Sequence, residues 1–411
     1  MTAPHWYRDL DPNGRRAFRS TYAAFSINAT TIQLYSFALP LLLTLWQLSP
    51  TAGGLLATVM LVASAAGGWL GGVASDRFGR VRMLQLTIVW MALATMCCGL
   101  AQNFGQLLVA RMLQGFGFGA EWAVGAVFMG EIAAAATRGR LVGTTQSAWA
   151  IGWGLAAATS TVALALLPPE PGWRAALFVS LPLALAIFAA RRRLSESAIF
   201  LAAPHAEAWH QIFSPRMRGN TVRGTLLAIG VHGGYWALAT WWPTMLRLER
   251  GMTSAQAATH MALLVGGSLA GYLLGATLAD RVGRRATLAL FALGGIATVL
   301  VATEGAISDA TLLAIGVPVG LFATGLYSVI GPVLNELYPT RLRGSGLGFC
   351  YNVGRGVAGL APLAVGGSAA AFGISHSIGL YVSFAYLLVL LTAALLRETK
   401  GMEFSPAVKG A

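Results

Sequence analysis

Charged residues are scarce in this chain, and a surface poor in charge suits a lipid environment better than water. Only 10% of the 411 residues are Asp, Glu, Lys or Arg, whereas 56% are hydrophobic. A soluble globular domain carries about a quarter charged residues, so the composition excludes an ordinary soluble enzyme or binding domain. Each bilayer crossing uses roughly 20 apolar residues, and the chain length suits about twelve crossings joined by short loops.

Cysteines are few as well. Cys97, Cys98 and Cys350 are odd in number, lie in apolar stretches and lack disulfide or metal-ligand spacing, so we expect buried small side chains and no metal site. The chain also lacks a Gly-x-x-x-x-Gly-Lys-Ser/Thr stretch and a nucleophile constellation, which argues against ATP-driven transport, enzymatic activity and a bound cofactor. The polar N-terminal residues 1–19 have no short apolar core behind them, so a cleaved signal peptide is not expected.

Long apolar runs, separated by polar or Pro- and Gly-marked breaks, occupy most of the sequence. Runs of this length cross a bilayer as helices, because backbone groups in lipid must be hydrogen-bonded within the segment. The sequence therefore predicts an all-α integral membrane protein with twelve transmembrane helices. The expected spans are residues 20–46, 53–75, 83–101, 105–130, 141–167, 174–190, 221–246, 256–279, 286–304, 309–334, 345–371 and 377–396.

Arginine clusters predict the orientation of these helices. The clusters lie at residues 77–82, 138–140, 191–193, 216–223, 281–285 and 341–343. The opposite loops hold only Arg174, Arg247 and Arg250. By the positive-inside rule the clusters and both termini are cytoplasmic, as in a bacterial inner-membrane protein. The net charge of +13 forms no basic stripe with interleaved aromatics, so we expect no nucleic-acid partner.

Two motifs recur at half the chain length. The run at residues 72–80 returns at 276–284, and the run at 131–143 returns at 336–348, which gives offsets of 204 and 205 residues. Two independent motifs at one offset indicate two six-helix halves. The expected domains are an N-terminal half at 1–193, a cytoplasmic linker at 194–219 and a C-terminal half at 220–411.

These motifs resemble the major facilitator superfamily. The Asp-Arg-x-Gly-Arg loop at 76–80, its copy at 280–284 and the Arg-x-x-Gln-Gly run at 111–115 carry a resemblance that covers essentially the whole chain. It implies two pseudo-symmetric six-helix halves that rock about a central site. Stretches 111–122, 336–344 and 351–355 are similar, more narrowly, to bacterial proton-coupled carriers of sialate, aromatic acids and other small carboxylates.

The first expected helix departs from that narrower pattern. Related carriers commonly have two acids there, in a pattern like Asp-Gly-x-Asp, whereas this chain has Asn28-Ala-Thr-Thr31. Neither Asn28 nor Thr31 can carry a proton. Proton coupling must therefore use another group or not operate.

Three charges fall deep inside expected helices, where an ionisable side chain costs several kcal/mol and is a functional candidate. Arg355 lies eleven residues after Gly344, which at ~1.5 Å per residue places it near the middle of a ~30 Å core. Tyr351 and Asn352 share its helical face. A guanidinium beside a phenol and an amide suits a small carboxylate, so we predict that these three residues bind substrate. The alternative is an arginine that pairs with Glu121 or helix carbonyls and only stabilises the bundle.

The other two deep charges are Glu121 and Arg111 in the fourth expected helix. Desolvation favours the protonated form of a carboxyl group, which makes Glu121 the predicted proton carrier. The alternative is a permanently ionised partner of an arginine. Arg111 either modulates that carboxyl or stabilises the local fold, and the sequence does not separate these two roles.

Aromatic residues are plentiful near the predicted site. The resemblance implies that helices 1, 4, 7 and 10 line the cavity, with contributions from 5, 8 and 11. The predicted walls of a pocket for a planar acid are Trp122, Gln146, Trp153, Tyr235 and Trp236. Trp241 and Trp242 are expected in an interfacial belt. His232 is expected to be a satisfied interior histidine, although it could titrate near neutral pH.

Charged residues also mark the cytoplasmic loops. The resemblance implies that they latch neighbouring helices in one conformation and release them in the other. The predicted gating residues are Asp76, Arg80, Asp280 and Arg284, together with the expected pairs Glu131 with Arg138 and Glu336 with Arg343. The alternative for the arginines is topology-setting charge alone, whereas acids have little effect on topology.

The leading functional hypothesis is a secondary transporter of a small organic anion, coupled to protons and acting as a monomer by alternating access. The alternative is a drug or metabolite exporter or uniporter without proton symport, which the missing acids of the first helix favour. A receptor built on a transporter scaffold would need an added soluble domain, for which the chain has no room.

Overall fold

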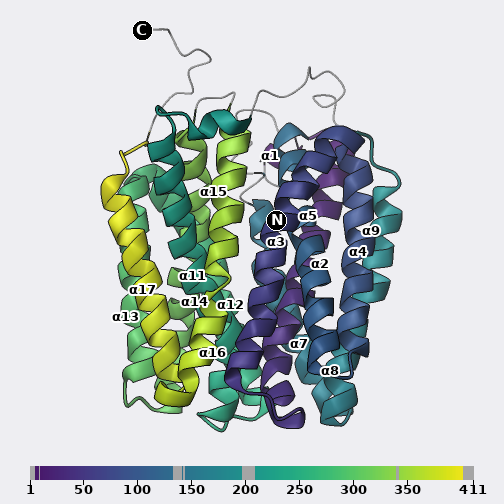
Figure 1. The fold of residues 1–411 in the computed structure, drawn as a ribbon, viewed down its shortest axis with the longest axis vertical. Helices are drawn as coiled ribbons and strands as arrows, with labels where there is room; N and C mark the ends of the chain where they lie inside the picture. Colours follow the sequence, from purple (N-terminus) through teal and green to yellow (C-terminus); the bar gives the residue numbers. More distant parts are fainter. Residues whose placement is uncertain are drawn as a thin grey trace. The chain divides into compact units, whose positions relative to one another are not determined.

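The computed structural model describes residues 5–8, 10–132, 141, 144–196, 209–338 and 342–400, and every regular element within them is helical. Figure 1 shows the helices in chain order. They are α1 (His5–Arg8), α2 (Pro12–Leu45), α3 (Pro50–Phe78), α4 (Arg80–Leu100), α5 (Phe104–Ile132), α7 (Ala148–Leu166), α8 (Pro169–Phe178), α9 (Ser180–Arg191), η1 (Trp209–Phe213), α11 (Arg218–Leu248), α12 (Ser254–Arg281), α13 (Arg284–Glu304), α14 (Asp309–Glu336), α15 (Arg343–Ala358), α16 (Ala361–Phe372) and α17 (Ile374–Leu395).

Two of the expected spans are broken. The span at 174–190 becomes α8 and α9, and the span at 345–371 becomes α15 and α16. Pro182 and Pro362 lie just after the breaks, and a proline cannot donate to the carbonyl four residues before it. With each pair counted as one crossing, the described helices fill the twelve expected spans. Nine spans in the described part of the chain are long and apolar enough to cross a membrane.

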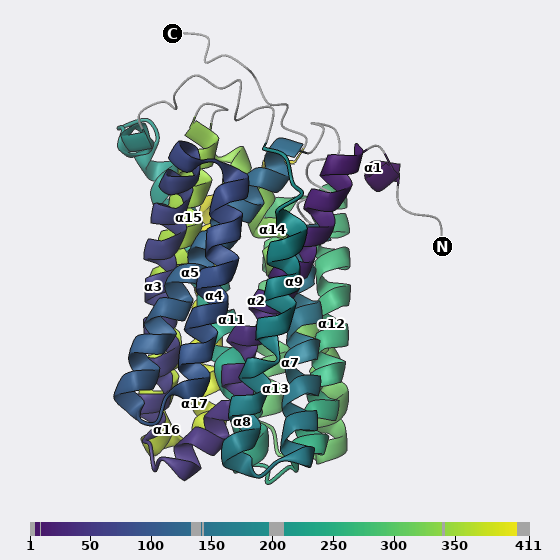
Figure 2. The same cartoon turned by 90° about the vertical axis from the view of Figure 1, so that its right-hand side faces the viewer.

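The helices form two compact units. The first contains Met1–Ala203 and Pro243–Met261, and the second contains Pro204–Trp242 and Ala262–Ala411. In the first unit α3 packs along α5, α2 packs along α7, and α4 lies against α5 and α9 (Figures 1 and 2). In the second unit α13 packs against α14 and α17, and α16 packs on α17.

Glycine makes the same helix crossing in both units. A Cβ atom on Gly67 of α3 would lie 2.0 Å from a carbonyl oxygen of α5, and one on Gly271 of α12 would lie 2.3 Å from a carbonyl oxygen of α14. Gly115 and Gly320 make the reciprocal approach, at 2.0 and 1.9 Å. Only glycine lets backbones come this close. The glycines are related by the offsets of 204 and 205 residues, so the sequence repeat extends to helix packing.

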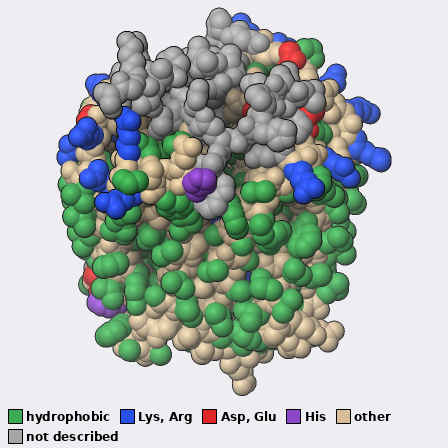
Figure 3. Space-filling model, turned by 45° about the horizontal axis from the view of Figure 1, so that its top comes forward, with side chains coloured by type: hydrophobic (Ala, Val, Ile, Leu, Met, Phe, Trp, Pro, Cys, Tyr) green, Lys and Arg blue, Asp and Glu red, His purple; other side chains and the backbone are tan. Residues whose placement is uncertain are grey.

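The outer faces of the helices are apolar. Large hydrophobic side chains such as Trp69, Leu93 and Phe384 are more than half exposed, which suits lipid rather than water. Figure 3 shows hydrophobic side chains over the flanks in view and Lys and Arg side chains gathered toward one end. Cys97 is also exposed, so the expectation of three buried cysteines is wrong for this residue.

Candidate functional site

The two Asp-Arg-x-Gly-Arg loops fold into the same turn. Gly79 has a φ of 95° and Gly283 a φ of 105°, a region that residues with a side chain rarely adopt. Gly79 directly follows α3 and Gly283 lies two residues after the end of α12, and in each case the next residue, Arg80 or Arg284, begins another helix. The glycine of the motif therefore reverses the chain, and the final arginine is the first residue of α4 or α13.

Each of these arginines binds a carboxylate at the end of a neighbouring helix. Arg80 Nη2 lies 2.9 Å from Oε1 of Glu131, the second-last residue of α5. Arg284 Nη2 lies 3.0 Å from Oε1 of Glu336, the last residue of α14. The four side chains are only 9 to 15% exposed, so these pairs are better shielded from water than surface salt bridges.

Several predicted gating residues cannot be placed. Arg138 lies outside the described residues, and so do the side chains of Asp76, Asp280 and Arg343. The expected pairs of Glu131 with Arg138 and of Glu336 with Arg343 stay predictions. The contacts that the structure does describe join each glutamate to the arginine of an Asp-Arg-x-Gly-Arg loop instead.

A second pair of carboxylates caps the helices that follow the two turns. Glu196 accepts a hydrogen bond from the backbone N–H of Val81 at 3.1 Å, and Glu398 accepts from those of Arg284 and Arg285 at 2.9 and 3.1 Å. Partial burial acts to raise the pKa of Glu398, but these bonds and two from the residues that follow it hold the pKa below its usual value. Sequence analysis missed both caps, although one acid follows the last helix of each expected half.

Glu121 lies in a buried ion pair with Arg191. Arg191 Nη2 lies 2.5 Å from Glu121 Oε1, Nη1 lies 3.1 Å from Oε2, and neither side chain is exposed. Thr87 donates to the same Oε2 atom, and Arg191 also donates to the carbonyl oxygen of Leu84 at 2.5 Å. The Glu121 carboxylate therefore has a bidentate arginine and a hydroxyl as hydrogen-bond partners.

Arg191 corrects the sequence analysis in one respect. The arginine run at 191–193 predicts a loop position, but Arg191 is the last residue of α9 and its side chain is fully buried. It is thus a fourth deep charge beside Arg111, Glu121 and Arg355. The alternative of an arginine-paired Glu121 is the one that these contacts support.

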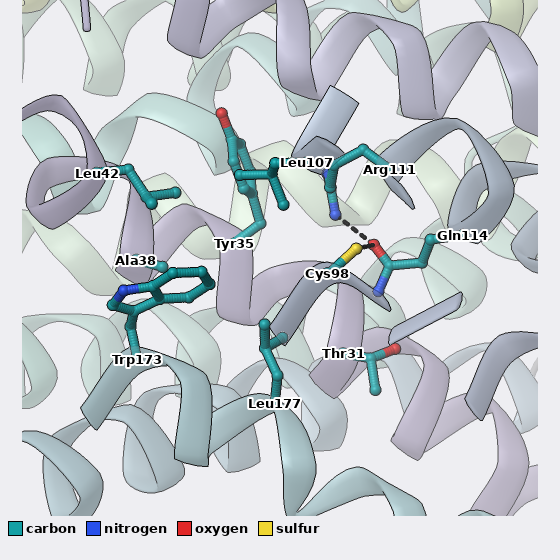
Figure 4. Close-up of a pocket in the computed structure, with 10 residues that line it drawn as sticks. All are labelled: Thr31, Tyr35, Ala38, Leu42, Cys98, Leu107, Arg111, Gln114, Trp173 and Leu177. Carbon is teal, nitrogen blue, oxygen red and sulfur yellow. Dashed lines mark hydrogen bonds between the residues drawn. The ribbon is translucent and has the colours of Figure 1, made fainter. Parts of the chain in front are cut away.

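Arg111 lies at a small pocket within the first unit (Figure 4). The guanidinium donates to Gln114 Oε1 at 2.6 Å and to the carbonyl oxygen of Leu56 at 3.3 Å, and it stacks on the ring of Tyr35. Thr31, at one of the positions where related carriers have acids, lines the same pocket. Among the described residues no carboxylate contacts Arg111, so amide, carbonyl and aromatic groups stabilise this buried cation.

Arg355 lies with its two predicted neighbours. Its Nη2 atom donates to Oδ1 of Asn352 at 2.8 Å, and its Cζ atom lies 5.9 Å from the centre of the Tyr351 ring. Arg355 is only 2% exposed. The structure therefore brings together the guanidinium, amide and phenol on one face of α15, while their role in binding substrate stays a prediction.

Aromatic rings from α11 and α14 extend this cluster. The Nδ1 atom of His232 lies 2.8 Å from the hydroxyl of Tyr327, and the His232 ring meets the Tyr351 ring edge-on with centres 4.5 Å apart. Tyr235 packs against both Tyr327 and Trp236 with ring centres 5.3 Å apart. We refer to Arg355, Asn352, Tyr351, His232, Tyr327, Tyr235 and Trp236 as the Arg355 cluster.

The remaining predicted wall residues lie in the first unit. Trp122 donates to Gln146 Oε1 at 3.2 Å, and Trp153 is almost fully buried. Sequence analysis missed Gln33 of α2, whose two amide atoms are buried without a hydrogen-bond partner among the described residues. Such an amide is costly in a protein interior, so it is a candidate ligand group.

The expectation of an interfacial belt at Trp241 and Trp242 is wrong. Both side chains are fully buried, and Trp241 donates to the carbonyl oxygen of Pro362 at 2.9 Å. The hydrogen bond joins α11 to the break between α15 and α16. The two indoles therefore pack inside the second unit rather than facing headgroups.

The comparisons with known proteins agree with this architecture. The sequence model of the Major Facilitator Superfamily matches residues 21–302 and 224–410. The chain belongs to the major facilitator superfamily. A protein described as a probable 4-methylmuconolactone transporter, from Cupriavidus pinatubonensis, is 36% identical over 403 residues, which cover 97% of this chain and 94% of the relative.

Two further similarities, one to a transport protein and one to a solved structure, also cover most of the chain. The cis,cis-muconate transport protein of Acinetobacter baylyi is 28% identical over 85% of this chain and 86% of its own length. A partially occluded, inward-open structure of the xylose transporter XylE from Escherichia coli matches with a TM-score of 0.77 at 17% identity, over 96% of this chain and all of that one. At that identity the match shows the fold alone. The chain is thus a multi-pass membrane transporter and not an enzyme.

Proposed function

We propose that this major facilitator protein is a secondary active symporter of a small organic anion, a mono- or aromatic carboxylate, with protons. It consists of two six-helix halves, 1–193 and 220–411, joined by the linker 194–219, and works as a monomer by alternating access. It lies in the bacterial inner membrane with both termini in the cytoplasm, as the arginine distribution indicates.

The observation that carries the proposal is the buried guanidinium of Arg355 with polar and aromatic groups beside it. An arginine fork matches both oxygens of a carboxylate, and Asn352 and Tyr351 add an amide and a ring on the same helical face. Tyr235, Trp236 and Tyr327 supply flat apolar surface for a planar acid. Of the charges in this second unit, Arg355 has the neighbours that a carboxylate site needs.

The relatives support the same class of cargo. The names of two proteins that match most of the chain refer to a muconolactone and to cis,cis-muconate. The second of these is a carboxylate, and both suit a pocket with one cation and several rings. We therefore propose the same class of substrate, a small organic acid, for this chain, without assigning it either of the two named compounds.

The test is a thermal-shift screen of the purified protein against benzoate, cis,cis-muconate, sialate and a short hydroxy-acid, with choline as a cation control. A true ligand stabilises the folded state by RT ln(1 + [L]/Kd), or about 2.7 kcal/mol at a concentration of 100 Kd. We expect at least one acid to stabilise the wild type and choline to leave it unchanged.

Arg355→Lys is the decisive variant in this screen. Lysine keeps the charge but loses the bidentate fork, so we expect the ligand affinity to fall about tenfold or more, a change of about 1.4 kcal/mol per factor of ten. Arg193→Lys, a matched change at an exposed arginine, should leave the affinity unchanged. Equal affinity in wild type, Arg355→Lys and Arg355→Ala would overturn the assignment of this site.

The alternative is an exporter or uniporter of the same fold that moves its cargo without a proton. Asn28 and Thr31 favour it, because α2 has no titratable group where related carriers have acids. The two functions differ in one result: only the symporter concentrates substrate when a pH gradient is the sole driving force.

A further inference from the structure

His232 is a buried histidine, and only one of its two ring nitrogens has a hydrogen-bond partner among the described residues. It is 1% exposed in the middle of α11, its Nδ1 atom shares a hydrogen bond with Tyr327, and its ring packs edge-on against Tyr351. Its Nε2 atom is buried and has no hydrogen-bond partner among the residues that the structure describes. A buried polar atom without a partner is rare enough to need an explanation.

The same histidine lies in the cluster of residues that would hold the substrate. Tyr351, which its ring touches, also contacts Arg355, and His232 is within electrostatic range of that guanidinium. Histidine is the side chain whose charge changes most readily between pH 5 and 8. The titratable His232 ring, whose Nε2 atom has no described hydrogen-bond partner, therefore lies near Arg355, the residue predicted to bind the substrate carboxylate.

We propose that His232 takes up the proton that accompanies a carboxylate bound at Arg355. The inference rests on the proposed function and deepens it, because it names the coupling group. In the empty site a charged His232 would lie near a second cation, so the ring stays neutral. The bound carboxylate offsets that repulsion and gives Nε2–H an acceptor, so the ring gains a proton from solvent.

Proton and substrate then stabilise each other. With the proton bound, both ring nitrogens are donors, and Nδ1–H donates to the Tyr327 oxygen while Nε2–H donates to the carboxylate. When the carboxylate leaves, the proton is lost to solvent again. By linkage, a group that binds a proton more tightly with ligand present makes the ligand bind more tightly at lower pH.

Other titratable groups around His232 do not compete for this role. His232 faces the phenols of Tyr327 on α14 and Tyr351 on α15 and the guanidinium of Arg355, and three further phenols lie around Tyr327, namely Tyr235, Tyr272 and Tyr386. Phenols and guanidinium groups keep their protons at neutral pH. Among the described residues no carboxylate contacts His232.

The experiment is isothermal titration of the purified full-length protein with benzoate and with cis,cis-muconate, each at several pH values and in two buffers of different ionisation enthalpy. The buffer dependence of the heat counts the protons taken up on binding. We expect the wild type to approach one proton per ligand, and its Kd to rise about tenfold per pH unit on the alkaline side. In His232→Gln both the proton uptake and the pH dependence of Kd should vanish.

His260→Gln is the control, since His260 is also buried but belongs to the first unit. Its proton uptake should equal that of the wild type. Tyr327→Phe keeps the histidine and covers the case in which His232→Gln does not fold. Its proton uptake should remain, with a midpoint shifted to lower pH, because the phenol oxygen no longer accepts from Nδ1–H.

The outcomes separate the two proposals. Binding without proton uptake in the wild type overturns the role of His232 and leaves the carboxylate site standing. Proton uptake in His232→Gln that equals that of the wild type would also overturn the role of His232. So would a pH midpoint of proton uptake in Tyr327→Phe that equals that of the wild type. If neither acid of the titration nor any acid of the thermal-shift panel binds, the proposed function fails and the inference fails with it.

Discussion

At the scale of single residues, the surroundings of the Glu121 carboxyl group depend on buried partners that are distant in the sequence. The sequence places a carboxyl group deep in a helix, where desolvation alone would favour its neutral form. The structure adds Arg191, with two oxygen contacts, and the hydroxyl of Thr87. A fully buried, bidentate ion pair of this kind gives Glu121 a structural role, while its role in proton coupling stays a prediction.

Removing the charge of Glu121 alone should therefore destabilise the protein. Glu121→Gln leaves a fully buried Arg191 without its counter-ion, and breaking such a pair typically costs about 3–5 kcal/mol. We expect a strongly lowered melting temperature in detergent. The double variant Glu121→Gln with Arg191→Met removes both charges and should recover most of the loss.

A different outcome would restore the coupling role of Glu121. That role requires Glu121→Gln to fold as well as the wild type and to keep counterflow exchange while losing accumulation driven by a pH gradient. If the single variant behaves in this way, the carboxyl group titrates during transport, and the assignment to His232 is not needed.

At the scale of elements, the charged turns tie three helix ends together in each unit. In the first unit Arg80 joins α4 to Glu131 on α5, and in the second Arg284 joins α13 to Glu336 on α14. Glu196 and Glu398 then cap the same two helices from the chain that follows α9 and α17. These contacts lie at helix ends, and none of their residues belongs to the Arg355 cluster, so they suit the control of movement rather than binding.

Glu131→Gln should accordingly slow transport more than it weakens binding. The amide keeps the shape but removes the charge that holds Arg80, so we expect turnover to fall several-fold while Kd stays within about twofold of the wild type, because the site itself is unchanged. Initial rates in proteoliposomes and Kd from titration provide the two numbers. Glu170→Gln is the control, since Glu170 pairs with Arg174 across 3.4 Å with a side chain that is 58% exposed. If Glu131→Gln transported at the wild-type rate but lost its affinity for substrate, a gating role for the Arg80–Glu131 pair would be contradicted.

The elements that the sequence predicts well are those encoded by local pattern. Apolar runs predict the helices, and the repeated Asp-Arg-x-Gly-Arg runs predict two matching turns, which the positive φ angles of Gly79 and Gly283 explain. The grouping of Arg355 with Asn352 and Tyr351 follows from helical spacing alone. Each of these depends on residues close in the chain.

What the sequence does not predict depends on contacts between distant segments. The partner of Glu121 is 70 residues away on α9, and nothing in the loop-like run at 191–193 marks Arg191 as buried. Trp241 and Trp242 have the composition of an interfacial belt but are fully buried, and Trp241 donates to the carbonyl oxygen of Pro362, 121 residues away. Gln33 has no motif, and only its burial without a partner identifies it.

At the scale of the whole molecule, the proposed symporter carries one negative charge, on the carboxylate, and one positive charge, the proton, in the same direction. A carboxylate neutralised by a proton on His232 adds no net charge to the Arg355 cluster. That balance keeps low the cost of carrying a charged group through the interior of a membrane protein. It also accounts for coupling without acids at Asn28 and Thr31.

The most direct test is accumulation of radiolabelled benzoate or cis,cis-muconate, whichever binds, in proteoliposomes of the wild-type protein. The vesicles are given an inwardly directed proton gradient, with counterflow of preloaded substrate measured in parallel. For a proton symporter we expect uptake above the equilibrium concentration that collapses when a protonophore removes the gradient, and counterflow that does not need the gradient. Counterflow without any accumulation would contradict it and would show that the carrier is an exchanger or facilitator.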